Sequence, residues 1–564
     1  VSLTKTGGGN DACNGGCTFN NTVSIINNST SYIYLENTTA STYNQAVVFS
    51  ALGNGALYPA RTAAGTQYKG NITVNSTGTG GVRFGQSSGT SSLAIGKTIV
   101  VGASGFTNGE LDLRGLTQLG TTAIVLTGSS SGRVRFEPNS TFNGKVTCSF
   151  PFVHLSGSTF NDTLRVTKTG SGNITGNGGC TFNAAVYITK NNSGNLILGE
   201  VSPDIFNANL FLDDQSGTGS IMLARTAAGN QFNGNIYINM NAAGINFGNN
   251  GGTSTLASTK TIQLWNDGCT AGTLGFRYFT QLGTTPLTIT QTTGTATFAF
   301  QLNSVFNAPI TIQFPNLSFQ GTTFNNTLTA TKVSASNNTS VGGNIFNGVV
   351  NLNVNGNGSF TMSSTLPDIF NDDLYIDNNS TTGSASIGVT GTGNEINADL
   401  FLNNTSTGGI GFGSGGGTTI ISASSNIAFF NNGFTAGPLN LRGVTRLGTD
   451  GLTLTQSSGS STIAFLLGTE INGPVTLTYP NINLDRATIN GDFTYTKGAA
   501  TANSCSGGCT FNGNFTFNNP LAGQVILGNT YADIFNGTTT ISQTGNAIFY
   551  LAHTAAGNQF NGNL

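Results

Sequence analysis

Two pairs of cysteines are the residues of this chain whose spacing most clearly suggests chemistry. Cys13 and Cys17 are separated by Asn-Gly-Gly, and Cys505 and Cys509 are separated by Ser-Gly-Gly. Two thiols this close across a glycine turn could close a local disulfide, so we predict a disulfide in each pair, with free thiols as the alternative. A zinc site would need two more ligands, and none recurs nearby. Disulfides would fit an oxidising, extracellular setting.

The two histidines do not have the setting of a catalytic acid, a base or a metal ligand. When the repeats of the chain are aligned, His154 corresponds to Ser318 and Asn483, and His553 corresponds to Arg61. Because other polar residues take the place of these histidines, we predict that both side chains point outward on the surface. The alignment shows no unique cluster of acidic and basic residues on one face, which a polysaccharide lyase on a parallel β-helix would need. We therefore expect a protein that is not an enzyme, with no catalytic residue, no cofactor and no metal site.

Three aspartates precede the same Ile-Phe-Asn motif, namely Asp204, Asp368 and Asp533, and Ser41 takes this place in the first repeat. Aspartate and serine share a short side-chain oxygen that can accept a hydrogen bond from the backbone of a turn. The pattern therefore favours a capping role for these residues over a pair of catalytic carboxylates.

These positions can be compared because the chain repeats itself about every 164 residues. The segment Arg61-Thr-Ala-Ala-Gly65 recurs at residues 225–229 and, with histidine for arginine, at residues 553–557. Thr4-Lys5 recurs at residues 167–168, 331–332 and 496–497. A repeat of fixed period is typical of a stacked array. We expect one continuous solenoid over residues 1–564, a piece of a longer array, with long repeats at about 3–165, 166–329, 330–494 and, incomplete, 495–564.

A shorter motif, an aromatic residue or isoleucine followed by asparagine, returns about every 18 to 26 residues. About seven units of about 23 residues fill each long repeat, and this is the size of one coil of a β-solenoid. Apolar residues alternate after each asparagine, which is typical of a strand, and glycine and asparagine clusters between them are typical of turns. The motif includes Phe19-Asn20, Phe142-Asn143, Phe182-Asn183, Phe206-Asn207, Phe232-Asn233, Phe370-Asn371 and Phe535-Asn536.

These patterns predict an all-β fold, a parallel β-solenoid with seven coils per long repeat and almost no helix. We expect the phenylalanine of each motif to stack on its counterparts in the neighbouring coils. The asparagine beside it makes the turn and can also form a hydrogen-bonded ladder along the corner. Outward threonines could line up on successive coils, namely Thr453, Thr455, Thr476, Thr478, Thr494 and Thr496.

The composition narrows the choice of partners. Charged residues make up only 7% of the chain, and the net charge is −2 at pH 7. The absence of basic clusters argues against a nucleic-acid partner. No apolar run is long enough to cross a membrane as a helix, so we expect no membrane span in this sequence. Low charge and threonine-rich faces leave lateral association with other copies open.

The repeats resemble those of giant extracellular repeat proteins of Bacteroidota, on the stretches at residues 203–207, 227–236 and 251–262. The resemblance covers essentially the whole chain, and it is specific to the style of repeat. Such proteins look like surface adhesins or filaments exported by the type IX secretion system, and one of them is the grappling-hook filament of predatory marine bacteria. The resemblance implies an extracellular filament with a mechanical or adhesive role, built from several copies of one chain.

Cell-surface or prey structures would then be contacted through regions outside this sequence. The alternative is a single-chain surface adhesin that binds glycans or ice through repeated threonine or asparagine faces. The sequence leaves both functions open.

Overall fold

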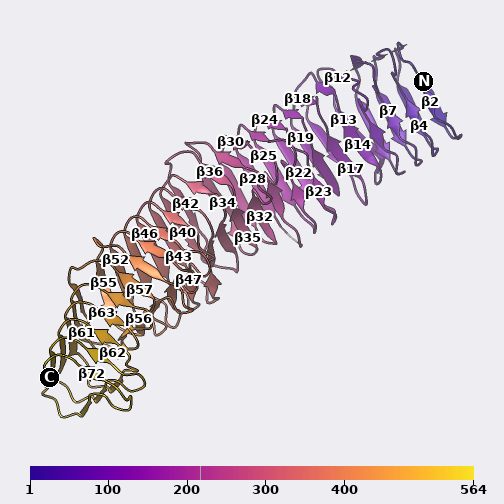
Figure 1. Ribbon diagram of the computed structural model, residues 1–564. Helices are drawn as coiled ribbons and strands as arrows, with labels where there is room; N and C mark the ends of the chain where they lie inside the picture. Colours follow the sequence, from indigo (N-terminus) through magenta and orange to yellow (C-terminus); the bar gives the residue numbers. More distant parts are fainter. Residues whose placement is uncertain (216) are drawn as a thin grey trace. The chain divides into compact units, whose positions relative to one another are not determined.

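The computed structural model describes residues 1–215 and 217–564. The chain is an all-β parallel β-solenoid of about 23 coils, and the described part contains no helix. This confirms the predicted fold class, and Figure 1 shows the strands following one another coil by coil. The coils belong to two compact units, Val1–Thr285 and Pro286–Leu564.

Coils pair through parallel strands, and the longest strands form what we call the long-strand face of each unit. In Val1–Thr285 this face consists of β1 (Ser2–Lys5), β4 (Val23–Asn27), β7 (Val47–Ala51), β10 (Ile72–Ser76), β13 (Ile99–Phe106), β16 (Ile124–Thr127), β19 (Val146–Phe150), β22 (Leu164–Lys168), β25 (Val186–Lys190), β28 (Leu210–Asp214), β31 (Ile236–Met240) and β34 (Ile262–Cys269). In Pro286–Leu564 it consists of β37 (Leu287–Thr290), β40 (Ile310–Phe314), β43 (Leu328–Lys332), β46 (Val350–Val354), β49 (Leu374–Asn378), β52 (Leu400–Asn404), β55 (Ile427–Phe434), β58 (Leu452–Thr455), β61 (Val475–Tyr479), β64 (Phe493–Lys497), β67 (Phe515–Asn519) and β70 (Thr539–Gln543).

Shorter strands form a second face. In the first unit these are β2 (Asp11–Ala12), β5 (Ile33–Tyr34), β8 (Leu57–Tyr58), β11 (Val82–Arg83), β14 (Glu110–Leu113), β17 (Arg133–Phe136), β20 (Phe152–Leu155), β23 (Ile174–Thr175), β26 (Leu196–Ile197), β29 (Ile221–Leu223), β32 (Gly244–Phe247) and β35 (Thr273–Phe276). In the second unit they are β38 (Thr297–Phe300), β41 (Asn316–Phe319), β44 (Asn338–Thr339), β47 (Phe360–Met362), β50 (Ala385–Ile387), β53 (Ile410–Phe412), β56 (Pro438–Leu441), β59 (Thr462–Phe465), β62 (Asn481–Leu484), β65 (Asn503–Ser504), β68 (Val525–Ile526) and β71 (Phe549–Tyr550).

The third row of strands contains the phenylalanine of the short motif, and we call it the motif corner. In the first unit it consists of β3 (Thr18–Phe19), β6 (Thr42–Tyr43), β9 (Thr66–Tyr68), β12 (Ser91–Leu93), β15 (Leu116–Gln118), β18 (Thr141–Phe142), β21 (Thr159–Phe160), β24 (Thr181–Phe182), β27 (Ile205–Phe206), β30 (Asn230–Phe232), β33 (Ser254–Leu256) and β36 (Phe279–Gln281). In the second unit it consists of β39 (Val305–Phe306), β42 (Thr323–Phe324), β45 (Ile345–Phe346), β48 (Ile369–Phe370), β51 (Asn394–Ile396), β54 (Thr419–Ile421), β57 (Val444–Arg446), β60 (Glu470–Ile471), β63 (Thr488–Ile489), β66 (Thr510–Phe511), β69 (Ile534–Phe535) and β72 (Gln559–Phe560).

The alternation of apolar and polar residues explains which side of each strand is buried. In β25, Val186 and Ile188 are buried, and Tyr187 between them is partly exposed. Parallel pairing places Val186 beside Leu210 and Ile188 beside Leu212 of the next coil. Because neighbouring strands lie only about 4.8 Å apart, each buried side chain packs directly on its counterparts, and the core continues from coil to coil.

The long-strand face is interrupted at the same place in three successive long repeats. The register shifts after Val74, Ile238 and Leu402 of β10, β31 and β52, where each pairs with an eight-residue strand. Extra residues there leave the sheet as a β-bulge. Pairing then resumes at Phe106, Cys269 and Phe434, so these three side chains share one buried position.

One corner of the coil accepts only glycine. Gly342 has a φ of +94°, and a Cβ built on it would lie 2.1 Å from the carbonyl oxygen of Leu366 in the next coil. A β-carbon at that distance would push neighbouring coils apart. Gly15, Gly178 and Gly507 hold the same place in the other long repeats, each with positive φ and a carbonyl within 2.2 Å of such a Cβ.

We predict that Gly342→Ala destabilises the protein more than Gly393→Ala. Gly393 also has a positive φ, of +84°, but has open space around a built Cβ. The control should therefore cost only the backbone strain, about 1–2 kcal/mol, and Gly342→Ala a further ~1–3 kcal/mol for the clash. Urea unfolding followed by circular dichroism measures both changes. Equal losses would show that the close approach of the coils at Gly342 is not a constraint.

Candidate functional site

The phenylalanines of the short motif stack on one another inside the solenoid. In the first unit, the ring of Phe182 lies 5.5 Å from that of Phe160 and 4.7 Å from that of Phe206, at interplanar angles of 11° and 18°. The stacks also contain Phe142 and Phe232 in the first unit, Phe324, Phe346 and Phe370 in the second, and Phe511, Phe535 and Phe560 further along; Phe19 stacks on Tyr43. The motif therefore supplies runs of stacked rings to the core of each unit, and these runs are interrupted where Leu93 and Gln118, or Ile396 and Ile421, take the place of the ring.

The asparagines beside these rings form hydrogen-bonded ladders on the outside of the motif corner. Nδ2 of Asn183 donates to Oδ1 of Asn161 at 2.7 Å, and Nδ2 of Asn207 donates to Oδ1 of Asn183 at 2.8 Å. The same bond links Asn44 to Asn20, Asn161 to Asn143, Asn233 to Asn207, Asn347 to Asn325, Asn371 to Asn347, Asn397 to Asn371, Asn512 to Asn490, Asn536 to Asn512 and Asn561 to Asn536. Each side-chain amide therefore links its coil to the neighbouring coil by one hydrogen bond.

The recurring aspartates cap the backbone of the coil before them. The carboxylates of Asp204, Asp368 and Asp533 accept the N–H of Cys180, Asn344 and Cys509 at 2.9, 2.8 and 2.9 Å, and Ser41 accepts that of Cys17 at 3.4 Å. Burial raises the pKa of Asp204 to about 7, and those of Asp368 and Asp533 to about 6. These carboxyls lie in separate coils, so they do not form a catalytic pair.

The lysines of the repeated Thr-Lys pairs point into the solenoid, a role that the sequence did not reveal. Nζ of Lys332 donates to the carbonyl oxygens of Ser334 and Gly358 at 2.6 and 3.1 Å. Burial lowers the pKa of Lys168, Lys332 and Lys497 to about 8. The repeats contain a sign of this role, because lysine recurs at the same position in every long repeat. A lysine on the surface could be replaced by other polar residues from one repeat to the next.

Cys13, Cys17, Cys505 and Cys509 are free thiols in this structure, which therefore differs from the prediction of disulfides Cys13–Cys17 and Cys505–Cys509. Sγ of Cys509 accepts the N–H of Ala487 at 3.4 Å, and the Cys505 thiol points to a backbone carbonyl of the coil before it at 3.7 Å. Both thiols thus contact the preceding coil. Burial raises the pKa of Cys505 to about 12, which makes it a poor nucleophile at neutral pH. Disulfides in the oxidised protein stay a prediction.

The second face of the first long repeat contains a cluster of charged residues that we did not expect. Arg83, Asp112, Arg135 and His154 share one register position on β11, β14, β17 and β20. The expectation that no acidic and basic residues gather on one face was wrong, because these residues are about one coil apart in sequence and meet only through stacking. The second long repeat has Asn246, Gly275, Ala299 and Ser318 there, and the third has Gly411, Asn440, Ala464 and Asn483.

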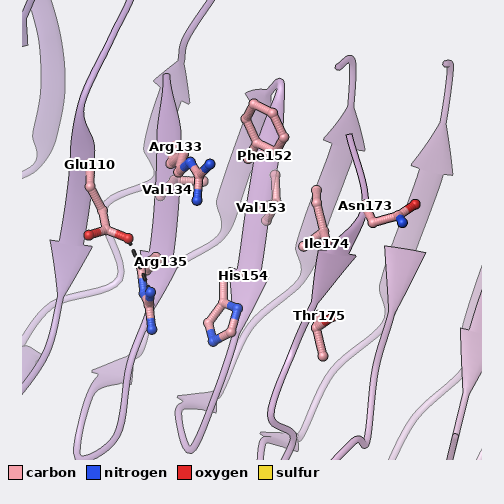
Figure 2. Close-up of a pocket in the computed structure, with 10 residues that line it drawn as sticks. All are labelled: Glu110, Arg133, Val134, Arg135, Phe152, Val153, His154, Asn173, Ile174 and Thr175. Atoms are coloured by element: carbon pink, nitrogen blue, oxygen red, sulfur yellow. Dashed lines mark hydrogen bonds and ion pairs between the residues drawn. The ribbon is translucent and has the colours of Figure 1, made fainter. Parts of the chain in front are cut away.

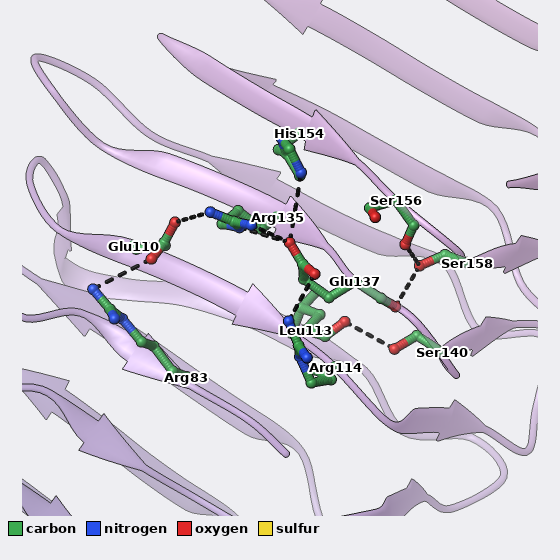
Figure 3. A network of polar contacts seen from close by, with 10 residues as sticks. All are labelled: Arg83, Glu110, Leu113, Arg114, Arg135, Glu137, Ser140, His154, Ser156 and Ser158. Atoms are coloured by element: carbon green, nitrogen blue, oxygen red, sulfur yellow. Dashed lines mark hydrogen bonds and ion pairs between the residues drawn. The ribbon is translucent and has the colours of Figure 1, made fainter. Parts of the chain in front are cut away.

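Glu137 is the centre of this cluster (Figure 3). Its side chain is only 3% exposed, and its carboxylate lies 2.7 Å from Nε of Arg135, 2.9 Å from Nη2 of Arg114 and 3.6 Å from Nε2 of His154. Glu110 adds contacts of 3.3 Å with Arg83 and 3.2 Å with Arg135. Paired guanidinium groups make a buried carboxylate tolerable. Burial, and then the charge of Arg135, lower the pKa of His154 below its usual value, so the imidazole is neutral at pH 7.

A hollow of about 160 Å³ opens on the outer side of the same strands (Figure 2). It lies between Arg133 and Phe152, which pair across β17 and β20, and Arg135 and His154, which pair in the same way. The guanidinium carbon of Arg133 lies 4.7 Å from the centre of the Phe152 ring. Glu110 and the buried side chains of Val134, Val153 and Ile174 also line the hollow, which therefore combines charged, aromatic and neutral polar groups with apolar side chains of the core.

Threonines line up on the long-strand face of the second unit. Thr453, Thr476 and Thr494 are register partners on β58, β61 and β64, and pairing continues through Thr516 to Thr540. A second row contains Thr455, Thr478 and Thr496. All eight are exposed or partly exposed. The two rows form a regular array of hydroxyl and methyl groups.

No protein-family model matches the chain, and no curated protein or solved structure compared with it is similar. Among residues 1–215 and 217–564, no three His, Cys, Asp or Glu side chains are grouped so that they could hold a metal ion. The same residues include no helix long and apolar enough to cross a membrane.

The raised pKa values of the buried aspartates predict how the stability of the fold depends on pH. A carboxyl whose pKa is higher in the folded than in the unfolded protein stabilises the fold most when both forms are protonated, below about pH 4, and this contribution is lost as the pH rises through about 6. Asp368→Asn, which keeps the acceptor oxygen for Asn344, should be about as stable as the wild type at pH 4.5. At pH 8 it should be more stable, by on the order of 2 kcal/mol.

Thermal unfolding between pH 4.5 and 8 tests this, with Asp450→Asn as the control because Asp450 is exposed. The control should follow the wild-type profile. A profile of Asp368→Asn parallel to the wild type would mean that Asp368 is not protonated in the folded protein.

Proposed function

We propose that this chain is a structural component of an extracellular filament or surface fibre, with a mechanical and adhesive role and with other copies of the same chain as partners. The observation that carries this proposal is the repetition of one set of contacts between coils. At the motif corner the same backbone bond, ring stack and amide bond connect one coil to the next, as Asn183 to Phe160 and Asn207 to Phe182 show, both at 2.8 Å.

Such a set of contacts suits a protein that resists tension. The hydrogen bonds between coils point from one coil to the next, so tension in that direction acts on all of them together with the ring stacks. Stability of a solenoid is approximately a sum over neighbouring units. The junctions between coils are therefore similar wherever the motif recurs, and the strength of the array does not depend on a single binding site.

Exposed aromatic rows support lateral contacts with other copies. On the long-strand face, the ring of Phe211 stacks between Tyr187 and Tyr237 at 4.4 and 4.5 Å, and Tyr375 stacks on Phe401 at 4.4 Å. These side chains are partly exposed. Trp265 of β34 packs edge-on against Phe211 at 5.3 Å, and Phe430 of β55 packs in the same way against Tyr375 at 5.5 Å. Both side chains are partly exposed, so they extend the aromatic rows. Stripes of this kind mark interaction surfaces when they are extended.

The remaining parts of the proposal rest on the resemblance of the repeats to extracellular proteins of Bacteroidota. These are the extracellular location, export through the type IX system, and attachment to cells or prey through regions outside this sequence. The proposal assigns no catalytic role, cofactor or nucleic-acid partner to this chain. Pairing of Glu110 and Glu137 with arginines supports a structural role for these carboxylates.

Electron microscopy of negatively stained cell-surface material, with antibody raised to this repeat, tests the proposal. We expect labelled fibres with an axial repeat near 34 Å, the height of about seven coils of about 4.8 Å. Their width would give the number of chains. Label spread over the envelope without fibres would contradict the filament and support a single-chain adhesin.

The threonine rows favour a second candidate function, binding of ice or of a flat glycan surface. We expect thermal hysteresis from the wild-type protein and its loss in Thr494→Lys, because a lysine at the centre of the array prevents a flat fit. Thr189→Lys, on the long-strand face of the first unit, is the control and should retain the activity. Absence of hysteresis in the wild type excludes ice, and a glycan array then tests the remaining ligand class.

A further inference from the structure

Arg133 has no acidic partner in the part of the chain that the structure describes. The other arginines of the cluster form ion pairs: Arg83 and Arg135 contact Glu110, and Arg114 contacts Glu137. The side chain of Arg133 is exposed, and its guanidinium group lies over the face of the Phe152 ring. A planar cation placed in this way keeps its N–H groups free to bind an anion.

Arg133 lies where two hollows meet. The first, of about 160 Å³, includes Phe152, His154, Asn173 and Thr175 in its lining. The second, of about 260 Å³, includes Arg83, Asn108 and Ser131. Both are lined by Arg133 and Glu110, so together they extend over several coils of the second face. A ligand bound at Arg133 therefore has room on both sides.

The side chains around Arg133 suit hydroxyl groups. Oδ1 of Asn173 accepts the N–H of Asn195 at 2.8 Å, which leaves the amide Nδ2 to donate outward. Thr175 and Ser131 provide hydroxyls, and both are exposed. The lining thus combines Arg133, which has no acidic partner among the described residues, with neutral hydrogen-bonding groups and with Glu110, whose carboxylate contacts Arg83 and Arg135. This arrangement matches a ligand with one anionic group and many hydroxyls.

We propose that these adjoining hollows bind an acidic saccharide, with the guanidinium group of Arg133 holding its carboxylate or sulfate oxygens. Arginine binds such oxyanions through two parallel N–H···O bonds. The sugar hydroxyls contact Asn173, Thr175 and Ser131. This site does not depend on filament assembly.

The charge of the surroundings supports an anion. Near Arg133 lie the guanidinium groups of Arg83, Arg114 and Arg135 and the carboxylates of Glu110 and Glu137. The third carboxyl, Asp112, is buried, and its pKa is raised to about 7, first by burial and then by the charge of Glu137. The cluster therefore has a surplus of positive charge in a chain whose net charge is −2.

This set of side chains does not recur in the second and third long repeats. In the second and third long repeats, Thr297 and Thr462 take the place of Arg133, and Ala299 and Ala464 take that of Arg135. The expected stoichiometry is therefore one saccharide per chain, in contrast to a binding surface that repeats with the coils.

Isothermal titration calorimetry on the full 564-residue chain tests the proposal. The probe is a chondroitin sulfate oligosaccharide, which has both carboxylate and sulfate groups, and the neutral polysaccharide dextran is the negative control. We expect one site per chain and at least a tenfold weaker affinity in Arg133→Met. Competition by glucuronate, and not by inorganic sulfate, would identify the carboxylate as the group held; the reverse would identify the sulfate ester.

Arg165→Met is the matched control. Arg165 also lies over an aromatic ring, that of Tyr187 at 3.7 Å, but on the long-strand face and outside both hollows. It should bind as the wild type does. Circular dichroism and the melting temperature of both variants show that each is folded. No binding by the wild type, or an equal loss in both variants, would overturn the proposal.

Discussion

The whole structure depends on one constraint: each coil must present the same backbone register to the coil before it and to the coil after it. In a parallel sheet, register places like residues about 4.8 Å apart. A ring such as Phe182 then meets another ring on each face, and an amide such as that of Asn183 donates on one side and accepts on the other. Each contact contributes little free energy, but the shared register repeats it from coil to coil.

The same constraint decides where polar groups can be buried. The corners of a coil contain N–H and C=O groups that the strand ladders do not use, and buried groups of this kind need partners. Buried aspartates accept such N–H groups, as Asp368 does, and buried lysines donate to such carbonyls, as Lys332 does. Polar side chains inside the solenoid thus complete its hydrogen bonding, and the raised pKa of the acids and lowered pKa of the lysines result from that burial.

Outward positions are free of this constraint, and the repeats differ there. A residue on the outer face is not packed into the core, so it can change without loss of the core. The first long repeat uses this freedom for the charged cluster around Glu137, the second for the row around Phe211, and the second unit for the threonine rows. A structural array can in this way acquire local binding surfaces without a change of fold.

The sequence by itself determined the solenoid, the coil length and the ring stacks. All of these follow from local periodicity, and a repeating chain displays that periodicity many times. The tertiary structure decided which outward side chains of different coils lie side by side. Arg83, Glu110 and Glu137 meet only because coils of unequal length bring their second faces into register. Their separation along the chain includes turns whose length no pattern of residues predicts, so neither the charged cluster nor the hollow beside Arg133 could be derived before the coils were stacked.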